Sequence, residues 1–130
     1  MAISIHPEPF DPWQALTEYQ QEHVKGMGAT AVFVGTMRDL NEGDEVRAMY
    51  LEHYPGMTEK AMQRLETDAH DLFGLMDVLI MHRVGDISPG DPIVLVATWS
   101  SHRKEAFESC RQIMESLKST VPFWKKETLL

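Results

Sequence analysis

The chain has 130 residues, 43% of them hydrophobic and 25% charged, and its formal net charge is −8. This length and composition are typical of one globular domain, which we expect to cover residues 1–130. The acidic balance disfavours binding to nucleic-acid backbones, and no apolar run is long enough to span a bilayer. The N-terminus also lacks the basic flank and long apolar stretch of a signal peptide, so we expect a cytoplasmic protein that binds neither nucleic acid nor membrane. The single cysteine, Cys110, excludes an intrachain disulfide and a zinc site with several thiolates.

The first half of the chain predicts a helix followed by two strands. Asp11 can cap a helix that has Pro12 in its first position, and Gly26 and Gly28 are expected to end this helix. Residues 29–37 are rich in strand-forming residues and apolar on both sides, which predicts a strand covered on both faces. A turn-rich segment separates it from a second strand at 46–54, and the two strands are candidates for a hairpin.

The rest of the chain predicts helices that alternate with strands. Helical periodicity runs over residues 58–73, where Gly74 is expected to end the helix, and again over 102–118. Strands are expected at 77–84 and 93–99, and a proline makes residues 121–126 extended. Because hairpins and helical crossovers both occur in this order, the fold class is predicted to be α+β.

Basic residues gather near the C-terminal end. Six of the twelve Lys and Arg residues lie between Arg103 and Lys126, which suits a small anionic ligand better than a polyanion. His102 and Arg103 would open the last helix, after a cap at Ser100 or Ser101. Free N–H groups and the positive end of the helix dipole attract anions at such a position. The alternative is a surface arginine and a histidine that packs near the cap.

Lys118 and Lys125 lie on either side of a Pro-Phe-Trp segment. Lys118 would end the last helix, where a cation can also merely offset the helix dipole. Lys125 follows Phe123 and Trp124, and the alternation of an extended chain would put Phe123 and Lys125 on one face. A lysine beside apolar rings can take part in proton transfer or can simply extend over an aromatic edge to reach water. Position alone leaves both interpretations open.

The remaining candidates are weaker. Arg38 directly follows a buried strand, where ligand-contacting residues are common, but it could also be a solvated loop arginine paired with a nearby Asp. Cys110 falls within the apolar stripe of its helix and is predicted to be a core residue, as are the nine methionines. His53, His70 and His82 lack the spacing of metal ligands, so we expect no metal site.

Four segments occur together in the order of a known family. They are Leu51–Glu59, His82–Gly85 with Gly90-Asp91, Ser101–Arg103 and Pro122–Glu127. Together they resemble the large, catalytic subunit of molybdopterin synthase, and the resemblance runs from about Gly28 to Glu127. Family members usually continue into a polar tail with another tryptophan and an arginine that helps complete the pocket, whereas this sequence stops at Leu130.

The resemblance implies an α/β-hammerhead fold with an additional antiparallel sheet. It implies a sulfurtransferase of molybdenum cofactor biosynthesis that works without a metal or other cofactor. Two large subunits would form a homodimer within a heterotetramer, each holding a small ubiquitin-like sulfur carrier that ends in Gly-Gly. Sulfur would pass from the carrier's C-terminal thiocarboxylate to cyclic pyranopterin monophosphate, a pterin phosphate, to form the dithiolene of molybdopterin. The alternative is a non-catalytic module that binds the carrier tail or a small phosphorylated ligand.

The resemblance also implies a set of site residues. They are Thr36, Met37, Arg38, His102, Arg103, Lys118, Lys125, Lys126 and Glu127. In the family's pattern, Arg38, His102 and Arg103 would hold the phosphate and the pterin. Lys118 and Lys125 would be the catalytic residues, stabilising negative charge and assisting proton transfer as the thiocarboxylate sulfur attacks.

Overall fold

The computed structural model describes residues 2–26, 28–38, 40–41 and 44–129, with residues 40–41, 44–47 and 126–129 described by their backbone alone. Within these residues lie three helices: α1 (Pro12–His23), α2 (Met57–Phe73) and α3 (Arg103–Ser119). The same residues form eight strands: β1 (Ala2–His6), β2 (Ala29–Thr36), β3 (Leu40–Asn41), β4 (Asp44–His53), β5 (Asp77–Arg83), β6 (Gly85–Ile87), β7 (Pro92–Ser100) and β8 (Phe123–Leu129). None of the described helices is long and apolar enough to cross a membrane.

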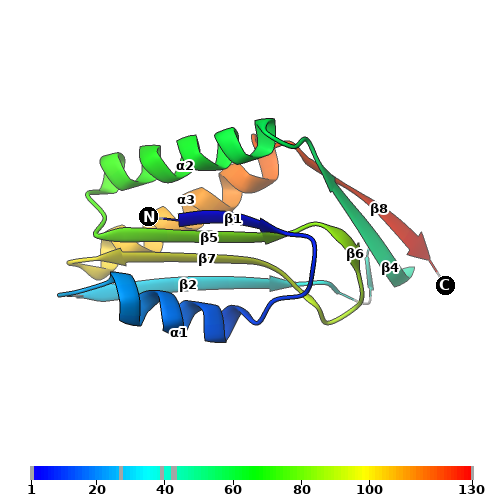
Figure 1. Cartoon of the computed structure of the whole chain (residues 1–130), viewed down its shortest axis with the longest axis horizontal. Helices are drawn as coiled ribbons and strands as arrows, with labels where there is room; N and C mark the ends of the chain where they lie inside the picture. The colour runs from blue at the N-terminus through cyan, green and yellow to red at the C-terminus, as the bar shows by residue number, and fades with distance from the viewer. Residues whose placement is uncertain (1, 27, 39, 42–43, 130) are drawn as a thin grey trace.

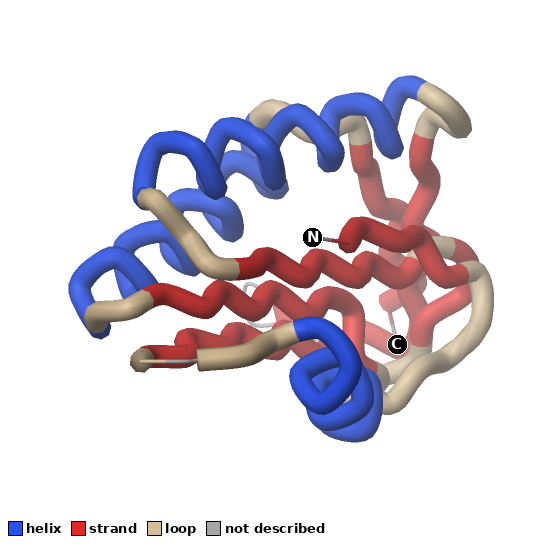
Figure 2. Tube along the Cα trace, turned by 60° about the vertical axis from the view of Figure 1, so that its left-hand side comes forward, coloured by secondary structure: helices blue, strands red, loops and turns tan. Residues whose placement is uncertain are grey.

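A four-stranded sheet in the order β1-β5-β7-β2 forms the centre of the molecule. β1 runs parallel to β5, and the other neighbours are antiparallel. Helices α2 and α3 cover one face of this sheet and α1 covers the other (Figures 1 and 2). β1 was not predicted, because five residues give too short a pattern to read. It is stabilised by pairing with β5, which places Ile3 beside Ile80.

Side chains that alternate along β5 and β7 fill a hydrophobic core on each face of the sheet. Towards α2 and α3, Ile80 and Val96 pack with Ile113 of α3, and all three are fully buried. Towards α1, the buried Trp99 donates a hydrogen bond from Nε1 to Oε1 of Gln20 at 3.0 Å. Burial of one large apolar side chain contributes about 1.5–3 kcal/mol, so these two cores hold the sheet and its helices as one scaffold.

A second, antiparallel sheet lies at one end of the first, as the steeply inclined β4 and β8 show in Figure 1. Its strands are ordered β3-β4-β6, and β8 also pairs with β4. The α+β class and the additional antiparallel sheet are therefore confirmed. The proposed hairpin between the strands at 29–37 and 46–54 is wrong, because β2 pairs with β7 whereas β4 pairs with β3, β6 and β8.

β2 is an edge strand, which contradicts the prediction that both of its faces are covered. Val32 and Phe33 remain 37% and 43% exposed. Because adjacent residues of a strand point to opposite faces, each face of β2 is partly open, although Ala31 packs in one core and Val34 against the other. The end of β2 is held by the backbone of Met37, the residue that follows it. The Met37 carbonyl accepts a hydrogen bond from the N–H of Gly90 at 2.8 Å, and the Met37 N–H donates to the carbonyl of Asp91 at 2.9 Å.

The helix ends follow the predicted signals in two cases of three. The Asp11 carboxylate accepts hydrogen bonds from the backbone N–H groups of Trp13 and Gln14, as expected of an N-cap. Gly74 ends α2 in the left-handed conformation, with φ of 62°. The cap predicted at Ser100 or Ser101 is wrong: His102 is the N-cap of α3 and makes no side-chain capping bond. Ser100 is still part of β7, so it cannot occupy the cap position.

Candidate active site

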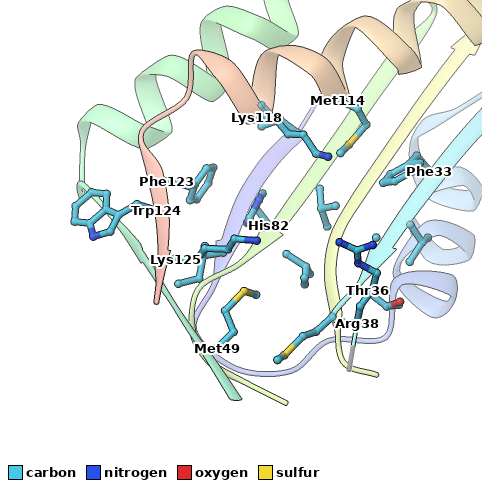
Figure 3. Close-up of a pocket in the computed structure, with 17 residues that line it drawn as sticks. Phe33, Thr36, Arg38, Met49, His82, Met114, Lys118, Phe123, Trp124 and Lys125 are labelled. Atoms are coloured by element: carbon cyan, nitrogen blue, oxygen red, sulfur yellow. The ribbon is translucent and has the colours of Figure 1, made fainter. Parts of the chain in front are cut away.

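A cleft of about 840 Å³ lies where the two sheets meet, at the C-terminal end of α3. Its lining comes from the end of β2, the last turns of α3, the start of β8 and the facing side of β4 (Figure 3). The lining residues are Phe33, Val34, Gly35, Thr36, Met37, Arg38, Met49, Leu51, His82, Ile93, Val94, Met114, Leu117, Lys118, Phe123, Trp124 and Lys125. The sequence-predicted residues Thr36, Met37, Arg38, Lys118 and Lys125 are thus brought together.

Three cationic side chains reach this cleft from three different elements. Arg38 follows the end of β2, Lys118 lies in the last turn of α3, and Lys125 lies in β8. Figure 3 shows the nitrogen ends of all three turned towards the same space. All three side chains are solvent-exposed, so a ligand that enters the cleft can contact them directly.

The direction of Lys118 is set by the packing of α3. Leu117, the preceding residue, is 4% exposed and belongs to the core between α3 and the sheet. Adjacent residues on a helix point about 100° apart, so Lys118 leaves the core and points towards the cleft. The positive charge of a lysine near a helix C-terminus also interacts favourably with the negative end of the helix dipole. Lys118 can therefore stabilise α3 and face the cleft at the same time.

The direction of Lys125 follows from strand alternation, as predicted. Phe123 and Lys125 line the cleft from β8, while the Trp124 ring turns outward (Figure 3). On that outer side Trp124 packs against Tyr54, with ring centroids 4.5 Å apart. Lys125 pairs in register with Leu51 of β4, which is also a lining residue.

His102 and Arg103 lie outside this cleft. They stand at the N-terminal end of α3, and both are exposed. Lys118 follows them by 16 and 15 residues, which is about 23–25 Å along the helix axis. One copy of the chain therefore does not bring them together with the three cations.

Lys126 and Glu127 are placed only by their backbone. They belong to β8 and pair in register with Tyr50 and Met49 of β4. Their side chains lie outside the described residues.

Sequence reasoning missed the apolar wall of the cleft. Phe33, Met49 and Met114 line it. Met49 is also buried, as expected of a core methionine, but its role in the cleft was not foreseen. Gly35 leaves room for this wall, because a Cβ atom added there would lie 2.9 Å from Val94 Cγ1 and 3.2 Å from Phe33 Cε1. The available signal was the spacing Phe33, Gly35, Met37, which places alternate residues on one face of β2 just before Arg38.

His82 was also missed as a residue of the cleft, since it was considered as a metal ligand and as part of a family motif but not as a site residue. It lines the cleft from β5, yet only 9% of its surface is exposed. Its ring stacks on Phe123 with centroids 3.9 Å apart and planes inclined by 15°. Burial lowers the pKa of His82 to about 4, so the imidazole is neutral and its Nδ1–H donates to the Arg83 carbonyl at 2.8 Å.

Cys110 is a core residue, as predicted. It is 7% exposed, and burial raises the pKa of its thiol to about 11. The thiol is thus protonated at neutral pH, and Cys110 is not among the residues that line the cleft with the three cations. Among the described residues, no three His, Cys, Asp or Glu side chains converge as metal ligands would.

Comparison with known proteins points to one family. Residues 5–120 match the sequence profile described as MoaE protein. The chain belongs to the MoaE protein family. The match extends from β1 to the end of α3 and so includes Arg38 and Lys118.

Relatives within the MoaE family agree over almost the whole chain. The molybdopterin synthase catalytic subunit of Pseudomonas aeruginosa is 47% identical over 98% of this chain and 84% of that protein. A solved structure of the molybdopterin biosynthesis MoaE protein from Burkholderia ambifaria has 45% identity and a TM-score of 0.85, covering 100% of this chain and 89% of that one. A complex of subunits 1 and 2 of molybdopterin-converting factor from Helicobacter pylori matches at 26% identity and a TM-score of 0.83, covering 98% of this chain and 84% of that one.

Proposed function

We propose that this chain is the catalytic subunit of a molybdopterin synthase. It transfers sulfur from the C-terminal thiocarboxylate of a small ubiquitin-like carrier to cyclic pyranopterin monophosphate and so builds the dithiolene of molybdopterin. The observation that carries the proposal is the convergence of Arg38, Lys118 and Lys125 in one cleft of a MoaE-family chain. The chain has the molybdopterin synthase large subunits as close relatives, at 47% identity in the case of Pseudomonas aeruginosa.

The charges of the cleft suit the two reactants, because both are anions. Arg38 supplies a planar guanidinium that can hold a phosphate by two parallel hydrogen bonds. Lys118 and Lys125 are point charges that stabilise the thiocarboxylate and the negative charge that develops during its attack. The apolar wall of Phe33, Met49 and Met114 limits water and strengthens these interactions.

Each transfer forms one carbon–sulfur bond on the substrate. The sulfur of the thiocarboxylate attacks a substrate carbon, and the oxygen on that carbon leaves with the bonding electrons. It leaves as an oxygen of the opened cyclic phosphate in one transfer and, after taking up a proton, as water in the other. Water then cleaves the bond between this sulfur and the carrier's carbonyl carbon. The carrier leaves with a carboxylate, the substrate keeps the sulfur, and the proton of the attacking water passes to a base in the cleft. Two such transfers give the dithiolene, with no oxidant, reductant or metal.

The partners of the proposal are the carrier and a second copy of this chain. The Helicobacter pylori structure is a complex of the two subunits of a related factor, which supports a small-subunit partner. His102 and Arg103 lie about 23–25 Å from Lys118, so they can join a substrate site only when a second copy supplies them. A homodimer within a heterotetramer in the cytoplasm is the arrangement that we propose.

Lysine variants test the proposal. With thiocarboxylated carrier and cyclic pyranopterin monophosphate, Lys118→Ala and Lys125→Ala should each reduce dithiolene formation by about 10²-fold or more. Lys60→Ala, an exposed lysine of α2 away from the cleft, should leave the rate unchanged. Thermal unfolding of each variant checks that the fold is intact. Full activity of both cleft variants would contradict the proposal, and carrier binding without turnover in the wild type would indicate a non-catalytic module.

A further inference from the structure

Lys118 and Lys125 belong to different parts of the scaffold. Lys118 is on α3, which packs on the first sheet, whereas Lys125 is on β8 of the second sheet. Among the described residues, β8 has a single sheet neighbour, β4. The relative position of the two lysines therefore depends on the contacts that join β8 to the first sheet.

Phe123 packs against the core cluster that contains Ile80 and Val94 of the first sheet, and two more specific contacts add to this connection. The hydroxyl of Thr58 on α2 donates to the Pro122 carbonyl at 3.0 Å, just before β8 begins. The second contact is the stack of His82 on Phe123, with centroids 3.9 Å apart and planes inclined by 15°. Of these two, only the stack joins a strand of the first sheet directly to a residue of β8.

His82 is itself held firmly. It lies in β5, an inner strand of the first sheet, paired with Ile5 of β1 on one side and Val94 of β7 on the other. Its Nδ1–H bond to the Arg83 carbonyl fixes the ring about its side-chain torsions. A ring fixed in this way offers Phe123 a flat surface in one orientation.

The position of Phe123 is passed on to Lys125. Residues two apart on a strand point to the same face and are about 6.6–6.8 Å apart along it. Phe123 and Lys125 both line the cleft, as does His82 (Figure 3). A shift of Phe123 therefore moves the Lys125 ammonium relative to Lys118.

We propose that His82 is a positioning residue for the sulfur-transfer reaction, because its stack on Phe123 fixes β8 and with it Lys125 in the cleft. The inference rests on the proposed function, and it assigns His82 no contact with the reacting atoms. Because a misplacement of about 1 Å can cost about 10²-fold in rate, loss of the stack should affect turnover much more than carrier binding.

Three variants separate positioning from other roles. His82→Ala removes the ring, and His82→Phe keeps a flat ring but has no ring nitrogen. Met81→Ala is the matched control, since Met81 is the neighbouring residue of β5, is 8% exposed, and packs in the core on the opposite face of the sheet. The kcat and KM of each variant are measured with thiocarboxylated carrier, at a temperature well below the melting temperature of that variant.

We expect His82→Ala to lower kcat by about 10-fold to 100-fold with a KM within about threefold of the wild type. His82→Phe should retain kcat within about threefold, and Met81→Ala should lower the melting temperature without a comparable loss of kcat. A His82→Phe variant as inactive as His82→Ala would overturn the proposal, because a ring nitrogen would then be needed. Equal kcat losses in Met81→Ala and His82→Ala would overturn it in favour of general destabilisation.

Hydrogen exchange tests the same inference without turnover. Backbone amides of residues 123–125 should exchange faster in His82→Ala than in wild type, and they should stay protected in His82→Phe and Met81→Ala. Unchanged protection in His82→Ala would contradict the positioning role even if the enzyme is active. A wild-type protein that makes no dithiolene would refute the proposed function, while this exchange pattern would still decide how β8 is held.

Discussion

Burial of His82 links the stability of the fold to pH. Burial, and to a lesser extent the nearby His53, lowers the pKa of His82 from 6.5 to about 4. The unfolded chain therefore binds a proton at a higher pH than the folded chain does, and stability falls as the pH drops from about 6.5 to about 4. Below that window the contribution of His82 no longer changes.

The free energy of unfolding should fall by up to about 3 kcal/mol over this window. The pKa of His82 differs by about 2.5 units between the unfolded and folded chains, and each unit corresponds to about 1.36 kcal/mol. Urea unfolding of the wild type and of His82→Phe at pH 7 and pH 4.5 measures this fall. The wild type should lose more stability than the variant, since the variant has no imidazole to protonate. Equal losses in the two proteins would show that other groups cause the pH dependence.

At the level of single residues, position in the chain made Arg38, Lys118 and Lys125 candidates but left a structural interpretation of each open. The resemblance to a known family made them site residues, and each lines the cleft. His82 was not selected as a site residue, because its role comes from a ring stack with a residue 41 positions later, between strands of different sheets. No local pattern in the sequence contains that contact.

At the level of the elements, α1 offers a direct test of a capping signal. The Asp11 carboxylate accepts from Trp13 N–H at 3.0 Å and from Gln14 N–H at 3.2 Å. Asp11→Ala should lower the free energy of unfolding by about 1 kcal/mol, because two N–H groups of the helix lose their partner. Asp11→Asn, whose amide oxygen can accept the same bonds, should lose only a fraction of this in urea unfolding. Similar losses for both would mean that charge, and not the cap, stabilises α1.

The elements that were predicted correctly are those with long local patterns, such as α2 and α3. Strand partners were harder, because β2 and β4 are close in sequence but pair in different sheets. Gly28 shows the same limit: it was taken as part of a helix end, yet a Cβ atom there would lie 2.1 Å from the Ser101 carbonyl oxygen. Its lack of a side chain serves a close approach between segments 73 positions apart.

At the scale of the whole molecule, the length of α3 offers a test of the proposed homodimer. His102 stands at one end of this helix and Lys118 at the other, about 25 Å away. If a dimer shares its sites, a mixture of His102→Ala and Lys118→Ala chains should contain dimers with one intact site. Refolding the two inactive variants together should then restore up to about a quarter of the wild-type activity for random pairing, whereas each variant refolded alone should stay inactive.

That fraction follows from pairing alone: half of the dimers would be mixed, and each would have one working site of two. Wild-type chains refolded with Lys118→Ala chains serve as the control for refolding yield. No recovery in the mixture, with good recovery in the control, would show that His102 acts within its own copy or outside the site.

The stoichiometry of sulfur transfer can be measured with purified components. Purified protein is mixed with cyclic pyranopterin monophosphate and thiocarboxylated carrier, and both the dithiolene product and the carrier's mass are followed. Two carriers should change from thiocarboxylate to carboxylate for each molecule of dithiolene formed, and neither change should occur without this chain. Carrier that stays thiocarboxylated in the presence of the protein and substrate, with no dithiolene formed, would contradict the proposed sulfur transfer.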